Sequence, residues 1–169
     1  MRLAIVGTGM MGSLIAQMAK DLKEIEHIDM VEPTTGKTLF DIEEPDVIID
    51  FSHPDALVNI CAYVKTREGQ TGIVFGTTGF ETEQLEIIKD LGNVVPIIQS
   101  YNYSYGVQTL KQLLGHAMPM LGDRADIEII EKHHNQKIDA PSGTAIMIAD
   151  AIKEEMKEEA EYVYDRHSV

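Results

Sequence analysis

A glycine-rich segment near the start of this 169-residue chain, Gly7-Thr8-Gly9-Met10-Met11-Gly12, constrains its fold more than any other feature. The segment stands between an apolar run, Leu3–Val6, which predicts a strand, and Met10–Lys20, which predicts a helix. In a G-x-G-x-x-G turn the first glycine permits a tight turn, the second lets the backbone approach a pyrophosphate, and the third allows close helix–strand packing. An acidic residue about 20 positions further on, here Glu32, can accept hydrogen bonds from ribose hydroxyls. The spacing therefore predicts a dinucleotide-binding turn, with an ordinary glycine turn and an incidental acid as the alternative.

The first part of the chain alternates short apolar runs with amphipathic stretches, a pattern typical of parallel α/β sheets. The further strands that it predicts are His27–Val31, Val47–Asp50, Gly72–Phe75 and Val94–Gln99, and the further helices are Pro54–Thr66 and Glu81–Leu91. Pro96 cannot donate a ladder hydrogen bond, so it indicates an edge position or a bulge for the last of these strands. We therefore expect an α/β fold whose residues 1–101 form a doubly wound, Rossmann-type parallel sheet.

The pattern changes after Gln99, where a polar and aromatic segment indicates a crossing between domains. The sequence then predicts a helix at Val107–Leu121, a strand at Ala125–Glu131 and a helix at Ser142–Lys157. A single strand has no partner for its backbone groups, so it must join the first sheet, pair with another chain, or find partner strands beyond Val169. We favour the last alternative and expect residues 102–169 to form a partial α+β substrate domain.

The charge balance narrows the classes of partner. Lys and Arg number 14 against 28 Asp and Glu, a formal net charge of −14, which disfavours binding to nucleic acid or to an anionic membrane surface. No apolar run approaches the roughly 20 residues of a membrane span, and the chain opens directly on a strand-like run instead of a signal peptide. The single cysteine, Cys61, fits a reducing compartment. We therefore expect a cytoplasmic protein in which any anionic small molecule binds at a local cationic pocket.

One polar segment supplies such a pocket. His133, His134 and Lys137 place up to three cationic groups within five residues, and Ser142-Gly143-Thr144 then begins a helix whose free N–H groups can hold a carboxylate. These residues suit an anionic substrate and proton transfer at neutral pH. A metal site is less well supported, because adjacent histidines in an extended segment point to opposite sides. An ordinary surface loop is the other alternative.

A second candidate for ligand contact is Gly76-Thr77-Thr78-Gly79, which directly follows a predicted strand. In an open α/β sheet the loops after the carboxyl ends of the strands line the ligand crevice. The two threonines can present backbone and side-chain groups to a nicotinamide or a ribose. An ordinary strand-to-helix turn is the alternative.

The segment Glu131-x-His133-His134-x-x-Lys137-x-Asp139-Ala140-Pro141-Ser142-Gly143-Thr144-Ala145 resembles the signature of the 4-hydroxy-tetrahydrodipicolinate reductase (dihydrodipicolinate reductase) family. The resemblance extends over nearly the whole chain. It includes the glycine-rich turn, Asp50-Phe51-Ser52-x-Pro54, Gly76-Thr77-Thr78-Gly79 and Tyr101-Asn102-Tyr103-Ser104-x-Gly106-Val107. The glycine turn is generic, whereas the segment from His133 to Thr144 is specific.

The resemblance implies an enzyme of diaminopimelate and lysine biosynthesis, in which NADH or NADPH delivers a hydride to a cyclic imine dicarboxylate with loss of water. It implies that His133 is the principal acid/base residue and Lys137 the proton donor, and that His134, Gly143 and Thr144 bind a substrate carboxylate. The cofactor contacts that it implies are Gly7, Thr8, Gly9, Met10, Met11, Gly12, Glu32, Gly76, Thr77, Thr78, Ser100, Tyr101, Asn102 and Tyr103. It further implies a homotetramer for the complete family protein. A nucleotide-binding fragment without turnover, or a related NAD(P)-dependent dehydrogenase of an amino-acid-derived substrate, are the alternatives.

Two departures from the family pattern bear on how the cofactor binds: one affects contacts to phosphate, and the other affects the choice between NADH and NADPH. Met10 stands where the family commonly carries Arg or Lys, and Glu32 is followed by Pro33 instead of a basic residue. A carboxylate without a neighbouring cation accepts ribose hydroxyls and repels a 2′-phosphate. We therefore expect NADH to bind at least as tightly as NADPH.

Overall fold

The computed structural model describes residues 1–32, 36–67, 70–121, 124–135, 137, 140–156 and 161–164. The chain divides into two compact units, Met1–Tyr101 and Asn102–Val169. Pro33, Asp139 and Lys157, which enter the sequence-based expectations, lie outside the described residues.

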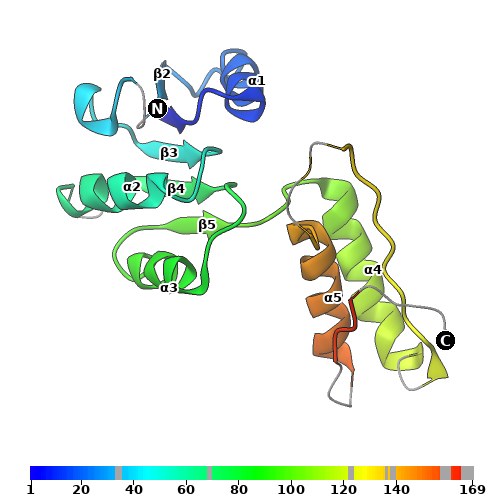
Figure 1. Cartoon of the computed structure of the whole chain (residues 1–169). Coiled ribbons are helices and arrows are strands. Elements are labelled where there is room, and N and C mark those ends of the chain that lie inside the picture. The colour runs from blue at the N-terminus through cyan, green and yellow to red at the C-terminus, as the bar shows by residue number, and fades with distance from the viewer. Residues whose placement is uncertain are drawn as a thin grey trace. The chain divides into compact units, whose positions relative to one another are not determined.

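The first unit is a five-stranded parallel sheet in the order β2-β1-β3-β4-β5 (Figure 1). Its strands are β1 (Arg2–Val6), β2 (His27–Val31), β3 (Val47–Asp50), β4 (Gly72–Phe75) and β5 (Ile97–Gln99). The connecting helices are α1 (Met10–Ala19), α2 (Ala56–Lys65) and α3 (Thr82–Leu91), with a short 3-10 helix, η1 (Leu39–Asp41), before β3. The expected α/β fold with a Rossmann-type domain is confirmed.

Helices cover both faces of this sheet because alternate residues of each strand point to opposite faces. On one face Ala4, Val6 and Ile48 pack with apolar residues of α2 and α3. On the other, Leu3 and Ile5 pack with residues of α1. The apolar runs that predicted β1, β3 and β4 are therefore what a parallel sheet buried on both faces requires.

The order of the strands reverses between β1 and β3. From β1 the chain proceeds outward to β2 on one side, and from β3 it proceeds through β4 to β5 on the other. Loops that leave the carboxyl ends of the two central strands therefore diverge, and ligands of open α/β sheets bind at such a switch point. The turn at Gly7–Gly12 and the segment after Asp50 begin at this edge.

The predicted strand bounds hold closely except at β5, which begins at Ile97 instead of Val94. Pro96 comes immediately before it, and its carbonyl still accepts a hydrogen bond from Ile73 N at 2.9 Å. β5 lies at one end of the strand order, so the edge position expected from Pro96 is confirmed. The 3-10 helix η1 was not predicted; its start is held by Thr38, whose hydroxyl accepts from Phe40 N.

The described residues of the second unit form two helices, α4 (Tyr105–Leu121) and α5 (Gly143–Glu155), which pack on each other. The prediction of a strand at Ala125–Glu131 is wrong, because these residues are exposed and belong to no strand. Ile127, Ile129 and Ile130 supply the apolar pattern of a strand, but no described segment of this unit pairs with them. In the part of the chain that the structure describes, no helix is long and apolar enough to cross a membrane.

Candidate functional site

The turn between β1 and α1 requires glycine at its first and third motif positions. Gly7 has a φ of 102°, in the left-handed region, and a Cβ on it would lie 2.4 Å from the carbonyl oxygen of Phe51. A Cβ on Gly12 would lie 2.0 Å from the carbonyl oxygen of Gly7. Helix α1 can therefore pack this closely on the turn only because position 12 has no side chain.

Gly9 has a different environment. Apart from Gly9 itself and its two chain neighbours, no described residue has an atom within 4 Å of the position that its Cβ would take. Gly9 is also the N-cap residue of α1 and provides no side-chain cap, so the first N–H groups of the helix are not satisfied by a capping side chain. Open space beside a helix N-terminus is what a bound pyrophosphate needs. The side chains of Met10 and Met11, which follow, are exposed.

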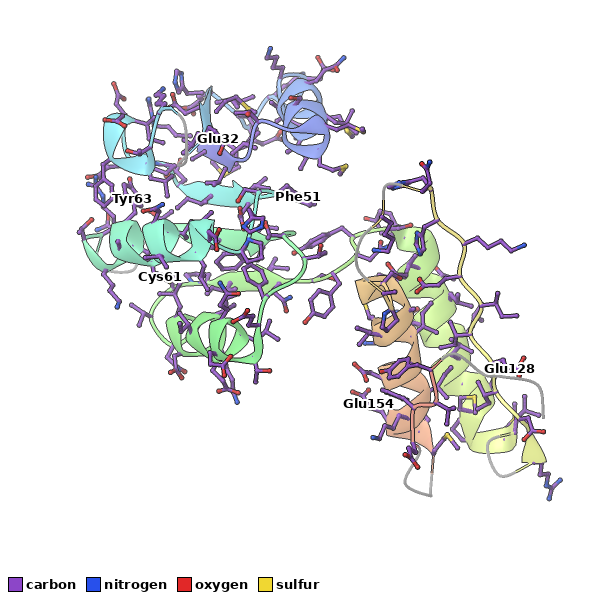
Figure 2. The ribbon with its side chains drawn as sticks, in the orientation of Figure 1. Glu32, Phe51, Cys61, Tyr63, Glu128 and Glu154 are labelled. Atoms are coloured by element: carbon purple, nitrogen blue, oxygen red, sulfur yellow. The ribbon has the colours of Figure 1, made fainter. Side chains whose placement is uncertain are left out.

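Glu32 follows β2 and is bound to the same turn. Its Oε2 accepts hydrogen bonds from Thr8 Oγ1 at 3.2 Å and from Thr8 N at 3.4 Å. The carboxylate thus lies beside the glycine turn, at the carboxyl edge of the sheet (Figure 2). This is the position from which an acidic residue can reach the ribose of a dinucleotide.

Lys37 is the first lysine or arginine after Glu32 in the sequence, but its ammonium group is bonded to Asp29. Its Nζ bonds Asp29 Oδ1, while His27 Nε2 lies 3.1 Å from Asp29 Oδ2. Burial acts to raise the pKa of Asp29, but the hydrogen bond and charge of Lys37 outweigh it and lower that pKa. The ammonium group of Lys37 is therefore paired with a carboxylate on β2.

The segments after β3 and β4 contact each other at the same edge of the sheet. The amide of Ser52 donates to Thr77 Oγ1 at 2.8 Å, and Thr77 is buried. A Cβ on Gly76 would lie 2.2 Å from the ring of Phe51, so Gly76 lets this ring pack directly on the chain after β4. Phe51 is labelled in Figure 2. Phe51 and Ser52 were absent from the predicted site, although the family-like segment that contains them was the available signal.

Asp50 ends β3 and lies beneath these segments, with no exposed surface. Its Oδ1 accepts a hydrogen bond from the Ser52 hydroxyl, whereas Oδ2 is buried without a hydrogen-bond partner among the described residues. Burial raises the pKa of Asp50, and the Ser52 and Thr77 hydroxyls oppose that rise. Asp50 was not among the predicted site residues, although it begins the same family-like segment as Phe51 and Ser52.

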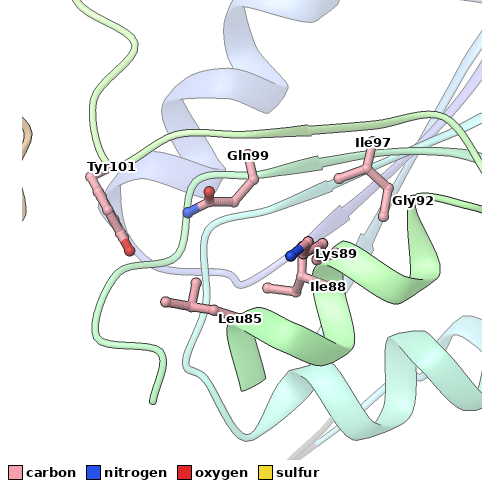
Figure 3. A pocket seen from close by; sticks show the side chains of 7 residues that line it. All are labelled: Leu85, Ile88, Lys89, Gly92, Ile97, Gln99 and Tyr101. Atoms are coloured by element: carbon pink, nitrogen blue, oxygen red, sulfur yellow. The ribbon is translucent and has the colours of Figure 1, made fainter. Parts of the chain in front are cut away.

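A cavity of about 450 Å³ lies between α3 and β5, apart from the glycine turn (Figure 3). Its lining residues are Leu85, Ile88, Lys89, Gly92, Ile97, Gln99 and Tyr101. Of the predicted cofactor residues only Tyr101 lines it. The cavity is therefore not the predicted dinucleotide site.

In the second unit, Glu131 joins His133 to the start of α5. Glu131 Oε2 lies 2.8 Å from His133 Nε2, and Oε1 accepts from Ser142 N at 2.9 Å. Ser142 in turn caps α5, because its hydroxyl accepts from Ala145 N at 3.1 Å. Hydrogen bonds from His133 and then from Ser142 lower the pKa of Glu131 to about 2.

A residue predicted to contact the cofactor and a residue predicted to bind the substrate are hydrogen-bonded to each other at the start of α5. Asn102 Nδ2, predicted to contact cofactor, donates to Thr144 Oγ1, predicted to bind substrate, at 2.9 Å. His134 and Lys137 follow His133, with Lys137 N donating to His134 O at 3.3 Å. Of the predicted substrate residues, Gly143 and Thr144 begin α5. Of the predicted cofactor residues, Asn102 and Tyr103 belong to the second unit and the others to the first. No group of three metal-ligating side chains occurs among the residues that the structure describes.

The sequence matches two family descriptions that together cover almost the whole chain. Residues 1–103 match "Dihydrodipicolinate reductase, N-terminus" and residues 106–168 match "Dihydrodipicolinate reductase, C-terminus". The chain belongs to the dihydrodipicolinate reductase family. The resemblance based on the segment from Glu131 to Ala145 is confirmed.

Similar proteins within the dihydrodipicolinate reductase family include a 4-hydroxy-tetrahydrodipicolinate reductase of Exiguobacterium sibiricum, 42% identical over 99% of this chain and 67% of the relative. The enzyme of the same name from Caldanaerobacter subterraneus subsp. tengcongensis is 40% identical over 99% of this chain and 69% of the relative. The chain therefore spans about two thirds of the length of these relatives. A solved structure, dipicolinate-bound dihydrodipicolinate reductase from Paenisporosarcina sp. TG-14, matches with a TM-score of 0.69 and 25% identity, over 99% of this chain and 71% of that one.

Proposed function

We propose that this protein reduces 4-hydroxy-tetrahydrodipicolinate with NADH or NADPH, releasing tetrahydrodipicolinate and water. One hydride and one proton enter the substrate as the water leaves, so the reaction balances. The observation that carries the proposal is the network in which Glu131 joins His133 to the capped start of α5, in a chain that belongs to this family along its length. The reaction belongs to diaminopimelate and lysine biosynthesis.

The first unit fits a dinucleotide cofactor, because the turn excludes side chains at Gly7 and Gly12 and leaves open space at Gly9. The backbone of this turn would hold the pyrophosphate, and Glu32 would accept hydrogen bonds from the adenosine ribose. Gly76, Thr77 and Thr78 would contact the nicotinamide end. Ser100, Tyr101, Asn102 and Tyr103 complete the proposed contacts. When bound, the nicotinamide supplies the hydride.

The second unit would bind and protonate the substrate. His134, Gly143 and Thr144 would hold a substrate carboxylate, since the start of α5 presents N–H groups and the histidine adds a donor. His133 would act as the principal acid/base group and Lys137 as a proton donor that also adds positive charge. His133, His134 and Lys137 lie within five residues of one another, which gives an anionic substrate a local cationic site in a chain with a formal net charge of −14.

We assign residues 1–101 to cofactor binding and residues 102–169 to substrate binding and catalysis, except that Asn102 and Tyr103 also contact the cofactor. A dicarboxylate as the small-molecule partner, a homotetrameric complete protein and a cytoplasmic location follow from the same proposal. The buried free thiol of Cys61 supports the location, since such thiols persist in reducing compartments.

The proposal is tested by NADH titration and steady-state turnover of the parent protein and of His133→Ala and Lys137→Ala. Each variant should lose turnover by about 10²–10⁴, the usual contribution of a positioned acid or base, while NADH affinity stays within error. His116→Ala removes an exposed histidine of α4 and should leave both quantities unchanged. NADH binding by a parent protein that turns over no dipicolinate-type imine would instead favour a nucleotide-binding protein without this activity.

A further inference from the structure

Glu131 has no role in the proposed chemistry, yet both of its carboxylate oxygens are used. Oε2 contacts His133 Nε2 at 2.8 Å and Oε1 accepts the amide hydrogen of Ser142 at 2.9 Å. The side chains of Glu131 and His133 are 29% and 38% exposed, so the pair lies at the surface and is held by contacts at both carboxylate oxygens. One carboxylate thus fixes the imidazole relative to the first residues of α5.

The identity of the partner atom determines where the histidine holds its hydrogen. An ionised carboxylate has only acceptor sites, so the imidazole nitrogen facing it must be the N–H donor. A neutral imidazole carries one N–H, and the other nitrogen is then an acceptor. Contact between Glu131 Oε2 and His133 Nε2 therefore leaves Nδ1 as the nitrogen without a hydrogen in the neutral ring.

We infer that Glu131 is a positioning residue that holds His133 in the Nε2–H tautomer, so that Nδ1 is the nitrogen that exchanges a proton with the substrate. This inference rests on the acid/base role proposed for His133. In the charged ring the Nδ1–H bond breaks, its electron pair stays on Nδ1, and the proton passes to the substrate. The Nε2 contact with Glu131 persists through the transfer. Because Glu131 also binds Ser142, it holds Nδ1 in a fixed relation to Gly143 and Thr144, the proposed carboxylate contacts.

The substitution Glu131→Gln tests this inference directly, because the Ser142 contact determines how the amide would lie. Ser142 N–H requires an acceptor, so the amide oxygen would take the place of Oε1. The amide NH₂ would then face His133 Nε2 and donate to it, which moves the ring hydrogen to Nδ1. Glu131→Asp keeps the carboxylate and should keep the parent tautomer, as the conservative counterpart.

The first measurement is ¹⁵N NMR of the imidazole nitrogens in the protein without ligands, at a pH above the titration of its histidines. The His133 signals are assigned by their loss in His133→Gln. The parent and Glu131→Asp should show a protonated Nε2, and Glu131→Gln a protonated Nδ1. A protonated Nδ1 in the parent, or the same tautomer in the parent and in Glu131→Gln, would overturn the inference.

The second measurement is turnover with NADH titration. Glu131→Gln should lower kcat by about 10²–10⁴, since inverting the histidine tautomer by an Asp→Asn change costs a serine protease about 10⁴. NADH affinity should be unchanged, and Glu131→Asp should recover part of kcat. Asp126→Asn removes an exposed carboxylate of the same segment and should keep parental kcat. Ser142→Ala removes the cap of α5 and should lower thermal stability with a smaller effect on kcat.

The outcomes separate this inference from the proposed function. If the parent protein turns over no dipicolinate-type imine, the proposed function fails, and the NMR measurement still decides whether Glu131 sets the tautomer. If turnover is present but Glu131→Gln loses kcat, NADH affinity and thermal stability together, Glu131 supports the fold and the positioning role is wrong.

Discussion

The buried carboxyl group of Asp50 should make the stability of the first unit depend on pH. Burial raises its pKa above the ordinary value, although the hydroxyls of Ser52 and Thr77 oppose the rise. In the unfolded chain the group ionises at its ordinary pKa, so the folded state holds the proton to a higher pH. The stability that this proton contributes is therefore full below the unfolded pKa and is lost as pH rises through the folded pKa.

Replacement of Asp50 by Asn should flatten this dependence, because an amide does not ionise and its oxygen can still accept from the Ser52 hydroxyl. Urea unfolding between pH 4 and pH 8 should show the parent losing stability relative to Asp50→Asn as the pH rises, by at most about 1.4 kcal/mol per pH unit. Asp41→Asn is the control for an exposed carboxyl whose pKa is lowered. A constant difference between parent and Asp50→Asn at every pH would mean that Asp50 titrates normally.

Glu32 should determine the choice between the two cofactors. Its carboxylate is held beside the glycine turn by Thr8, while the Lys37 ammonium is paired with Asp29. Nothing in that arrangement favours a 2′-phosphate, so NADH should bind at least as tightly as NADPH. In direct titrations Glu32→Ala should weaken NADH more than NADPH, and Glu32→Gln, which keeps an acceptor for Thr8, should improve NADPH relative to NADH. A clear NADPH preference that survives in Glu32→Ala would contradict the assignment.

At the scale of the element, the turn between β1 and α1 separates a glycine needed for folding from one needed for binding. Gly12→Ala forces a Cβ into the carbonyl of Gly7 and should lower the stability of the first unit by about 1–3 kcal/mol. Gly9→Ala has space for its methyl group and a φ of −67°, so stability should stay within about 0.5 kcal/mol of the parent. The same methyl group would enter the space proposed for the pyrophosphate. NADH should therefore bind Gly9→Ala about tenfold more weakly or worse.

Thermal unfolding and NADH titration of both variants, with Gly106→Ala on α4 as a control, check this separation. A Cβ on Gly106 would meet only the Ser104 hydroxyl, at 3.6 Å, which is an ordinary contact. If Gly9→Ala bound NADH as the parent does, the pyrophosphate would not lie against this turn.

The elements also show which parts of the fold were predictable from the sequence. Strands β1, β3 and β4 are mostly apolar runs between turn residues, a local signal that arises because both faces of the sheet are buried. β2, at the end of the strand order, also contains His27 and Asp29 and is only partly buried. The segment Ala125–Glu131 carries a similar local signal but forms no strand. A strand depends on a partner, and the local pattern contains no information about one.

Part of the candidate site was also predictable from the sequence, and part of it was not. The glycine turn was predictable because its spacing follows from the geometry of one local turn. Asn102 and Thr144 are 42 positions apart and Glu131 and Ser142 are 11 apart, so no local sequence pattern specifies either contact. Asp50 was missed for the same reason, since its burial depends on the segments after β3 and β4.

At the scale of the molecule, the two units differ in how much apolar surface they bury. Every member of the two core clusters belongs to residues 1–101, in both layers around the sheet. The buried apolar side chains that the structure describes after Tyr101 are Met118, Ala151 and Ile152. Because folding must offset about 1–2 kcal/mol of backbone entropy per ordered residue, a unit with so few buried side chains gains little stability by itself.

We therefore predict that residues 1–101, expressed alone, fold cooperatively and bind NADH, whereas residues 102–169 expressed alone do not unfold cooperatively. In the whole chain, amides of β1 should exchange hydrogen slowly, because this strand is paired on both sides and Leu3 to Val6 are buried. Amides of residues 125–131 should exchange orders of magnitude faster, because these residues are exposed and belong to no strand. Hydrogen exchange with calorimetry of the two fragments makes the comparison. If residues 125–131 were protected as strongly as β1 in a monodisperse monomer, they would have a strand partner within these 169 residues. The second unit would then be a cooperative domain in its own right.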